Sequence, residues 1–115
     1  MANAETMLQQ NIRLALGKLP GVRMFRNSVG QAETSDGRVI QFGLCRGSSD
    51  LVGYVSTEIT PDMVGKRVAI FTSIEIKTKH GRVSELQQNF IDRVQLDGGI
   101  SGVARSIEEA EALCR

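Results

Sequence analysis

The chain has 115 residues, a hydrophobic content of 41% and a formal net charge of +1 at pH 7, which argues against strong non-specific attraction of nucleic acid by the whole chain. This length favours one domain, residues 1–115, since it allows one buried core but not two. No run approaches the roughly 20 apolar residues of a membrane span, and the N-terminus lacks a signal-peptide layout, so we expect a cytoplasmic protein without a membrane partner.

The first expected element is an amphipathic helix over residues 3–19. Its apolar residues recur at helical spacing, and Pro20 with Gly21 ends the pattern. The expected buried stripe consists of Leu8, Ile12, Ala15, Leu16 and Leu19. Glu5 lies at the edge of this stripe, where its carboxylate could face the core of a sheet. It could equally be a first-turn acid that the helix dipole favours.

Two strands are expected next, over residues 22–27 and 38–44, joined as a hairpin by a polar loop that contains glycine. Arg26 and Asn27 could contact phosphate, or Arg26 could be solvated on an exposed strand face. The small-residue turn that follows includes Gly47, which could serve the turn alone or could let phosphate approach the backbone closely.

The acidic residues of interest lie at the ends of two further expected strands. Asp50 precedes the strand 51–55, and Glu75 and Lys77 end the longest expected strand, residues 67–77. Because successive side chains of a strand point to opposite faces, Glu75 and Lys77 share a face. If the two strands are neighbours, Asp50 lies near Glu75. Two close carboxylates repel unless a cation separates them, and hard oxygen ligands suit Mg²⁺ or Mn²⁺.

The strand 67–77 carries apolar residues on both faces, which is typical of a central strand covered on both sides. A helix is expected over residues 84–97, where Ser84 and Gln87 have the spacing of a capping box. Gln87 could also face the edge of the sheet, so a cap and a place in a site both stay open. An edge strand over residues 100–104 and a final helix over residues 106–113 complete the chain.

The acidic pattern is similar to that of the PD-(D/E)xK nucleases, with Ser49-Asp50 in place of their Pro-Asp dipeptide. Surrounding residues extend the similarity in a fixed order: Phe25-Arg26-Asn27 with Gly30, Gly47-Ser48-Ser49-Asp50, Thr60-Pro61 with Gly65, Glu75-Ile76-Lys77, Gly81 with Ser84 and Gln87, and Gly98-Gly99. In this order and spacing, nearly the whole chain resembles the VRR-NUC (virus-type replication-repair nuclease) branch of that superfamily.

The resemblance implies an α/β fold with a restriction-endonuclease-like core, in which helices flank a mixed central sheet. It also implies a site for Mg²⁺ or Mn²⁺ and a set of residues that bind nucleic acid. The expected metal ligands are Glu5, Asp50, Glu75 and the carbonyl of Ile76, and the expected catalytic residues are Asp50, Glu75, Lys77 and Gln87. The expected nucleic-acid contacts are Arg26, Asn27, Ser48, Ser49, Lys79, Arg82 and Ser84.

These residue types suit phosphodiester hydrolysis. Asp50 and Glu75 could hold one or two ions that acidify water and clamp phosphate oxygens. Lys77 could orient or deprotonate the attacking water, or it could stabilise the developing negative charge, and the sequence leaves both roles open. An alternative nucleophile and base, Cys45 with His80, has no family signature around either residue.

The predicted function is therefore that of a metal-dependent endonuclease acting on DNA. The resemblance implies branched, flapped or junction DNA, including Holliday junctions, in replication, repair or recombination of a bacterial cell or a phage-infected host. It also motivates the expectation of a homodimer. Aromatic residues make up only 4% of the chain, which favours contacts to the DNA backbone over base stacking. The alternatives are a non-catalytic nucleic-acid-binding module and the nuclease subunit of a larger complex.

Overall fold

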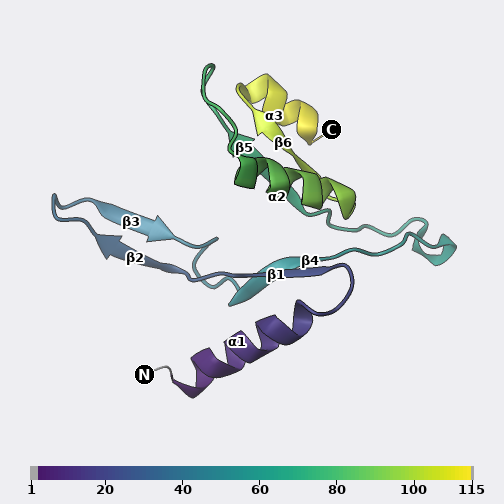
Figure 1. Ribbon diagram of the computed structural model, residues 1–115, viewed down its shortest axis with the longest axis horizontal. Helices are drawn as coiled ribbons and strands as arrows, with labels where there is room; N and C mark the ends of the chain where they lie inside the picture. Colours follow the sequence, from purple (N-terminus) through teal and green to yellow (C-terminus); the bar gives the residue numbers. More distant parts are fainter. Residues whose placement is uncertain (1–2, 115) are drawn as a thin grey trace. The chain divides into compact units, whose positions relative to one another are not determined.

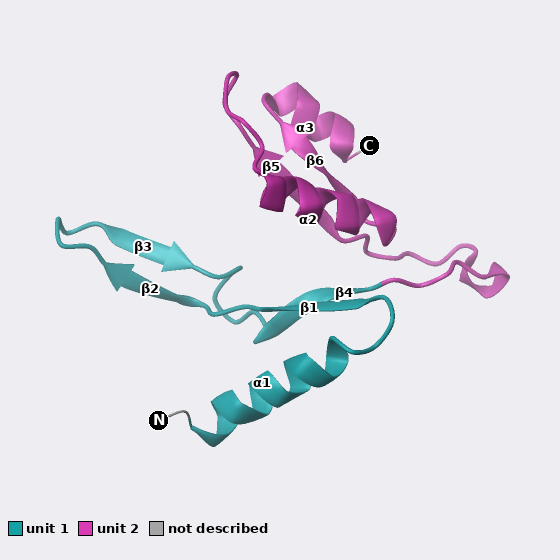
Figure 2. Cartoon of the chain, viewed as in Figure 1, with its two compact units in different colours: residues 1–55 teal, residues 56–115 magenta. Residues whose placement is uncertain are grey.

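The computed structural model describes residues 3–114. The chain divides into two compact units, residues 1–55 and 56–115, which we call the N-terminal and C-terminal units (Figure 2). The elements, in chain order, are α1 (Ala4–Leu16), β1 (Val22–Arg26), β2 (Gly30–Glu33), β3 (Val39–Phe42), β4 (Leu51–Val55), the 3-10 helix η1 (Pro61–Met63), β5 (Thr72–Ile76), α2 (Glu85–Leu96), β6 (Ile100–Ala104) and α3 (Ile107–Leu113) (Figure 1). Over the described part of the chain, no helix has the length and apolar character needed to cross a membrane.

The strands pair as three two-stranded sheets, β1 with β4, β2 with β3, and β5 with β6. The mixture of helices and strands confirms the α/β composition, whereas the expected single mixed sheet is not confirmed. The expectation of one domain over residues 1–115 stays a prediction.

In the N-terminal unit, β1 pairs with β4 in antiparallel register, from Val22 opposite Val55 to Arg26 opposite Leu51. Helix α1 begins at its N-cap Asn3, whose side chain accepts a hydrogen bond from the backbone of Thr6 at 2.8 Å. This side chain satisfies one of the backbone donors that the first turn leaves free, so the helix start is defined locally.

The expected hairpin between residues 22–27 and 38–44 is wrong. Strand β3 pairs instead with β2, which lies in the segment that the sequence predicts to be a loop. The turn between them is closed by the backbone N–H of Thr34, which donates to the carbonyl of Arg38 at 2.7 Å, and Gly37 adopts a φ of 86°. Because β2 carries Gly30 and no β-branched residue, its propensity gave no strand signal. The ring of Phe42 covers the space beside Gly30, as a Cβ there would lie 2.6 Å from it.

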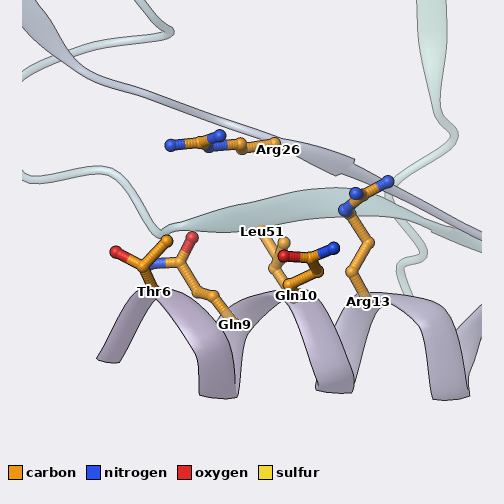
Figure 3. A pocket seen from close by; sticks show the side chains of 6 residues that line it. All are labelled: Thr6, Gln9, Gln10, Arg13, Arg26 and Leu51. Atoms are coloured by element: carbon orange, nitrogen blue, oxygen red, sulfur yellow. The ribbon is translucent and has the colours of Figure 1, made fainter. Parts of the chain in front are cut away.

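The expected burial of one apolar stripe of α1 is also wrong. No residue of α1 is buried, and Leu8 and Ile12 are 59% and 42% exposed. The helix ends at Leu16, so Leu19 lies beyond it. A polar stripe of α1 instead faces β1 and β4 (Figure 3). A two-stranded sheet offers only a narrow apolar face, which is too little to cover a helix stripe of this length.

The C-terminal unit is a β–α–β arrangement in which β5 and β6 run parallel, from Thr72 opposite Ile100 to Ile76 opposite Ala104. Parallel neighbours require a crossover connection, and α2 provides it. The small core consists of Ile91 and Val94 from α2 and Ala104 from β6. Helix α3 packs on β6, where the leucine Leu113 occupies the space beside Gly102.

The strand expected over residues 67–77 is shorter than predicted, because β5 spans only Thr72–Ile76. Its pairing is limited by β6, which has five residues and ends the ladder at both sides. The expected cover on both faces is not observed, since Val68, Ile70 and Ile76 are 55%, 52% and 70% exposed.

Candidate functional site

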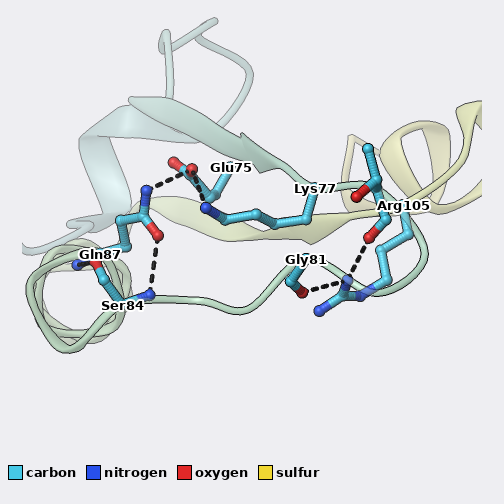
Figure 4. Close-up of polar contacts among 7 residues, drawn as sticks. Glu75, Lys77, Gly81, Ser84, Gln87 and Arg105 are labelled. Carbon is cyan, nitrogen blue, oxygen red and sulfur yellow. Dashed lines mark hydrogen bonds and ion pairs between the residues drawn. The ribbon is translucent and has the colours of Figure 1, made fainter.

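Glu75 and Lys77 lie side by side at the end of β5. The Lys77 Nζ atom is 3.4 Å from Glu75 Oε1, and the two side chains are only 20% and 32% exposed, respectively (Figure 4). This adjacency confirms the prediction from strand alternation. Partial burial reduces the screening that weakens surface ion pairs, so each charge stabilises the other more than it would in open solvent.

Gln87 joins this pair through the first turn of α2. Its Nε2 donates to Glu75 Oε1 at 2.8 Å, while its Oε1 accepts from the backbone N–H of Ser84 at 2.9 Å (Figure 4). The Ser84 hydroxyl completes the capping box by accepting from the backbone of Gln87 at 3.1 Å. The cap and the site contact, which the sequence left open as alternatives, are therefore made by one amide group at the same time.

Lys77 and Gln87 both contact the same carboxylate oxygen of Glu75. Lys77 and Gln87 contact Oε1, and neither contact uses Oε2. The N-terminus of α2, with its positive dipole end, lies next to this carboxylate through Gln87. The arrangement fixes the orientation of the Glu75 side chain and leaves its second oxygen for a further ligand.

The carbonyl of Ile76 points away from β6. Lys77 N–H donates to the carbonyl of Ala104 at 3.1 Å, and Ile100 N–H donates to the carbonyl of Phe71 at 2.9 Å. In a parallel ladder, the backbone N–H and C=O groups of successive residues point to opposite edges of the strand. Those of the odd-numbered residues of β5 therefore point to β6, and those of Ile76 point to the opposite edge. Its carbonyl is thus not used by the β5–β6 ladder.

A cavity of about 250 Å³ opens beside Glu75 within the C-terminal unit. Its lining combines apolar and polar side chains: Ser73, Ile74, Glu75, Leu86, Gln87, Phe90, Ile91 and Ser101. The hydroxyls of Ser73 and Ser101 are hydrogen-bonded to each other at 2.8 Å, and Ser101 is buried. An apolar cavity with a few oriented polar groups next to a carboxylate is the usual form of a small ligand site.

Asn27 organises the segment that leads to Asp50 in the N-terminal unit. Its buried side chain donates to Ser48 Oγ at 2.7 Å and to the Ser49 carbonyl at 2.8 Å, and it accepts from the Leu44 backbone at 2.9 Å. Its own backbone N–H donates to the Asp50 carbonyl at 2.8 Å. Asn27 thus fixes the turn before β4, a structural role that was missed, and its contact with nucleic acid stays a prediction.

Two arginines line a small polar cavity between α1 and the β1–β4 pair (Figure 3). Arg26 ends β1 and Arg13 lies on α1, and the remaining lining residues are Thr6, Gln9, Gln10 and Leu51. The cavity holds about 50 Å³, and no acidic side chain lines it. Two guanidinium groups without an acid between them form a place where an anion would be stabilised.

The expected metal ligands are divided between the units. Glu5 is exposed in the first turn of α1, where the helix dipole accounts for it, and its role as a ligand stays a prediction. Within residues 3–114, no three His, Cys, Asp or Glu side chains gather as a metal-binding cluster. Within the C-terminal unit, the Glu75 carboxylate and the Ile76 carbonyl offer hard oxygen donors of the kind that suits a divalent cation, and the metal site stays a prediction.

The remaining predicted contacts lie near Glu75 in the sequence of the C-terminal unit. Lys79 and Arg82 belong to the loop between β5 and α2, and Ser84 is the N-cap of α2. Sequence reasoning did not single out Arg105, whose guanidinium contacts this loop. Arg105 is one of 14 basic residues, and neither its neighbours nor its spacing distinguish it.

Glu75 and Lys77, two positions apart at the end of β5, together with a helix-borne glutamine on the carboxylate, form one hydrogen-bonded group on an α/β unit. The chain matches the VRR-NUC domain family over residues 5–108. It therefore belongs to this family, as its sequence resemblance indicated, and the family implies nuclease activity with DNA as the substrate. No curated protein and no solved structure matches the chain significantly.

Proposed function

We propose that the chain is a divalent-metal-dependent endonuclease that hydrolyses DNA phosphodiester bonds in branched, flapped or junction DNA. The observation that carries this proposal is the convergence of Lys77 and Gln87 on one oxygen of Glu75. A carboxylate held by two donors is preorganised, so little reorganisation is needed when a charged substrate arrives.

Asp50, Glu75 and the Ile76 carbonyl would hold Mg²⁺ or Mn²⁺, with Glu5 as a further ligand. When bound, such an ion acidifies water and offsets negative charge on the phosphate. The Oε2 atom of Glu75, which neither Lys77 nor Gln87 contacts, suits this task because a metal ligand needs a free lone pair.

Lys77 would act on the phosphate or on the attacking water. Its ammonium is held 3.4 Å from Glu75 Oε1, which keeps a positive charge beside the carboxylate where the scissile phosphate would lie. From there it can orient the attacking water, or stabilise the negative charge that grows on the phosphate oxygens. Gln87 holds the carboxylate in place throughout, since its other end is anchored in the helix cap.

DNA would be gripped through its backbone rather than its bases. In the N-terminal unit, Arg26 and its neighbour Arg13 line one cavity without an acid, and Ser48 and Ser49 lie in the turn before Asp50. In the C-terminal unit, basic residues occupy the loop 78–83. Contacts of this kind fix the register of a duplex without reading its sequence, so selectivity would come from DNA shape.

The test is a panel of labelled flap, fork, four-way junction and linear duplex DNAs, incubated with Mg²⁺, with Mn²⁺ or with a chelator. We expect internal cuts that require the metal and that are faster on the branched substrates. Metal-dependent cutting at equal rates on all substrates would remove the structure selectivity alone. A different result is that the wild-type protein cleaves no substrate, while DNA binding survives replacement of both Asp50 and Glu75. That result would show a non-catalytic DNA-binding module instead of a nuclease.

A further inference from the structure

Arg105 directly follows β6, and its guanidinium reaches back to the loop between β5 and α2. Its Nη1 atom lies 2.8 Å from the carbonyl of Gly81 (Figure 4). The same atom lies 2.6 Å from the carbonyl of Thr78 and 3.4 Å from that of Lys79. One side chain thus collects three backbone acceptors from a segment at least 24 residues away in the sequence.

Three carbonyl oxygens that converge on one point repel one another unless a cation lies between them. The Arg105 guanidinium supplies that cation, and hydrogen bonds from a charged donor are roughly twice as strong as neutral ones. Within the turn itself, the backbone N–H of Gly81 donates to the Thr78 carbonyl at 3.1 Å. The conformation of the loop therefore depends largely on Arg105.

The base of the Arg105 side chain is itself held on both sides. The carbonyl of the preceding Ala104 accepts from Lys77 N–H at 3.1 Å, which ties the end of β6 to the end of β5. The backbone N–H of Arg105 donates to Glu109 Oε1 at 2.7 Å, which ties it to the first turn of α3. Arg105 can therefore transmit the position of β6 and α3 to the loop.

We propose that Arg105 is a positioning residue for the nuclease site. The loop begins directly after Lys77 and ends at Ser84, the N-cap of α2, so both of its ends carry groups that converge on Glu75. By holding the loop, Arg105 keeps the start of α2, and with it the Gln87 amide, in reach of the Glu75 carboxylate. This proposal rests on the proposed nuclease function for its effect on rate, but its effect on the loop does not.

The test compares the wild-type protein with Arg105→Gln and Arg105→Lys. Limited trypsin digestion under native conditions, read by mass spectrometry, measures cleavage after Lys79 and Arg82 inside the loop. We expect Arg105→Gln to raise this cleavage rate and to lower kcat on the preferred DNA, each by about tenfold, with KM nearly unchanged, because a hydrogen bond from a charged donor to clustered acceptors contributes about this much. Arg105→Lys keeps the charge and should recover most of both.

Arg67→Gln is the matched control. Arg67 is an exposed arginine of the same unit that lies before β5. This variant loses the same charge and should leave loop cleavage and kcat near the wild-type values.

Loop cleavage that is unchanged in Arg105→Gln would overturn the proposal, and so would faster loop cleavage without a loss of kcat. If the wild-type protein cuts no DNA at all, the proposed nuclease function and the effect of Arg105 on its rate are both refuted, while the trypsin result still shows whether Arg105 holds the loop. The two failures are thereby distinguished.

Discussion

Two side chains of the C-terminal unit converge on the carboxylate of Glu75. Lys77 neutralises it, Gln87 orients it, and both act on one oxygen. Neither contact contributes much to the core, because the core of this unit consists of Ile91, Val94 and Ala104. Glu75, Lys77 and Gln87 hold one another in a fixed orientation but do not form the core. Replacing them should therefore change activity far more than stability.

We expect Glu75→Ala and Asp50→Ala each to lower kcat by at least about 100-fold, because each removes a proposed metal ligand. The free energy of unfolding should change by no more than about 1 kcal/mol, since Asp50 is exposed and the partly exposed Glu75–Lys77 ion pair contributes little. Steady-state cleavage and urea denaturation measure the two effects. Glu85→Ala, which removes an exposed acid from the first turn of α2, serves as the control. A Glu75→Ala protein with wild-type turnover in Mg²⁺ would remove the metal-site assignment.

For Lys77→Ala we expect a fall in kcat of about 100-fold with metal affinity within about threefold of the wild-type value, because the ammonium acts on water or phosphate rather than as a ligand. Calorimetric titration with Mn²⁺ in the absence of DNA measures the affinity. If affinity fell as steeply as rate, Lys77 would instead be a counter-charge that maintains the Glu75 carboxylate.

At the scale of elements, the first turn of α2 combines a local motif with a tertiary contact. A capping box needs only residues three apart in the sequence, so it forms wherever the helix starts. In Gln87, the Oε1 atom makes the cap, and the crossover from β5 to β6 places the Nε2 atom over Glu75. A substitution that keeps the Oε1 acceptor but replaces the Nε2 donor separates the contribution of the cap from that of the contact with Glu75.

Gln87→Glu makes this separation. A glutamate at this position can still accept from the Ser84 backbone, but it cannot donate to Glu75 and places a second negative charge beside it. We expect the free energy of unfolding to change by less than about 0.5 kcal/mol and kcat to fall by about tenfold or more. Asn89→Asp adds the same charge at an exposed position of the same helix and controls for charge alone. Equal activity in the two variants would reduce Gln87 to a cap.

In the whole molecule, one chain supplies one proposed metal site. A single site would cut one strand at a time, whereas paired cuts across a four-way junction need two sites related by a two-fold axis. Pairing would also double a basic footprint that is modest in one copy, since the net charge is only +1.

We therefore predict a homodimer. Light scattering at micromolar concentration, with and without a four-way junction, should give twice the 12.5 kDa mass of one chain. Paired cuts on opposite strands of the junction would support the same conclusion. A mass near 12.5 kDa under both conditions would leave a monomer that nicks flaps or serves as a subunit of a larger complex.

The features that could be predicted from the sequence are local ones. The capping box of Ser84 and Gln87, the strand Ile100–Ala104 and the shared face of Glu75 and Lys77 all follow from residues within a few positions of each other. Caps depend on three-residue spacing and strand faces on alternation, so both can be read without knowing the fold. The family, too, was recognisable from the order of its motifs, and the match over residues 5–108 confirms it.

Other features were decided by tertiary structure. The pairing of β1 with β4, the bond from Gln87 to Glu75, the hydrogen bonds of Asn27 and those of the Arg105 guanidinium join residues between 12 and 33 positions apart. The same side chains could make equally good contacts elsewhere, because the donors and acceptors of a side chain do not specify which residue it will bond. Which partner each one meets depends on strand pairing and on the crossover of α2, and these depend on the whole chain being folded rather than on any single segment.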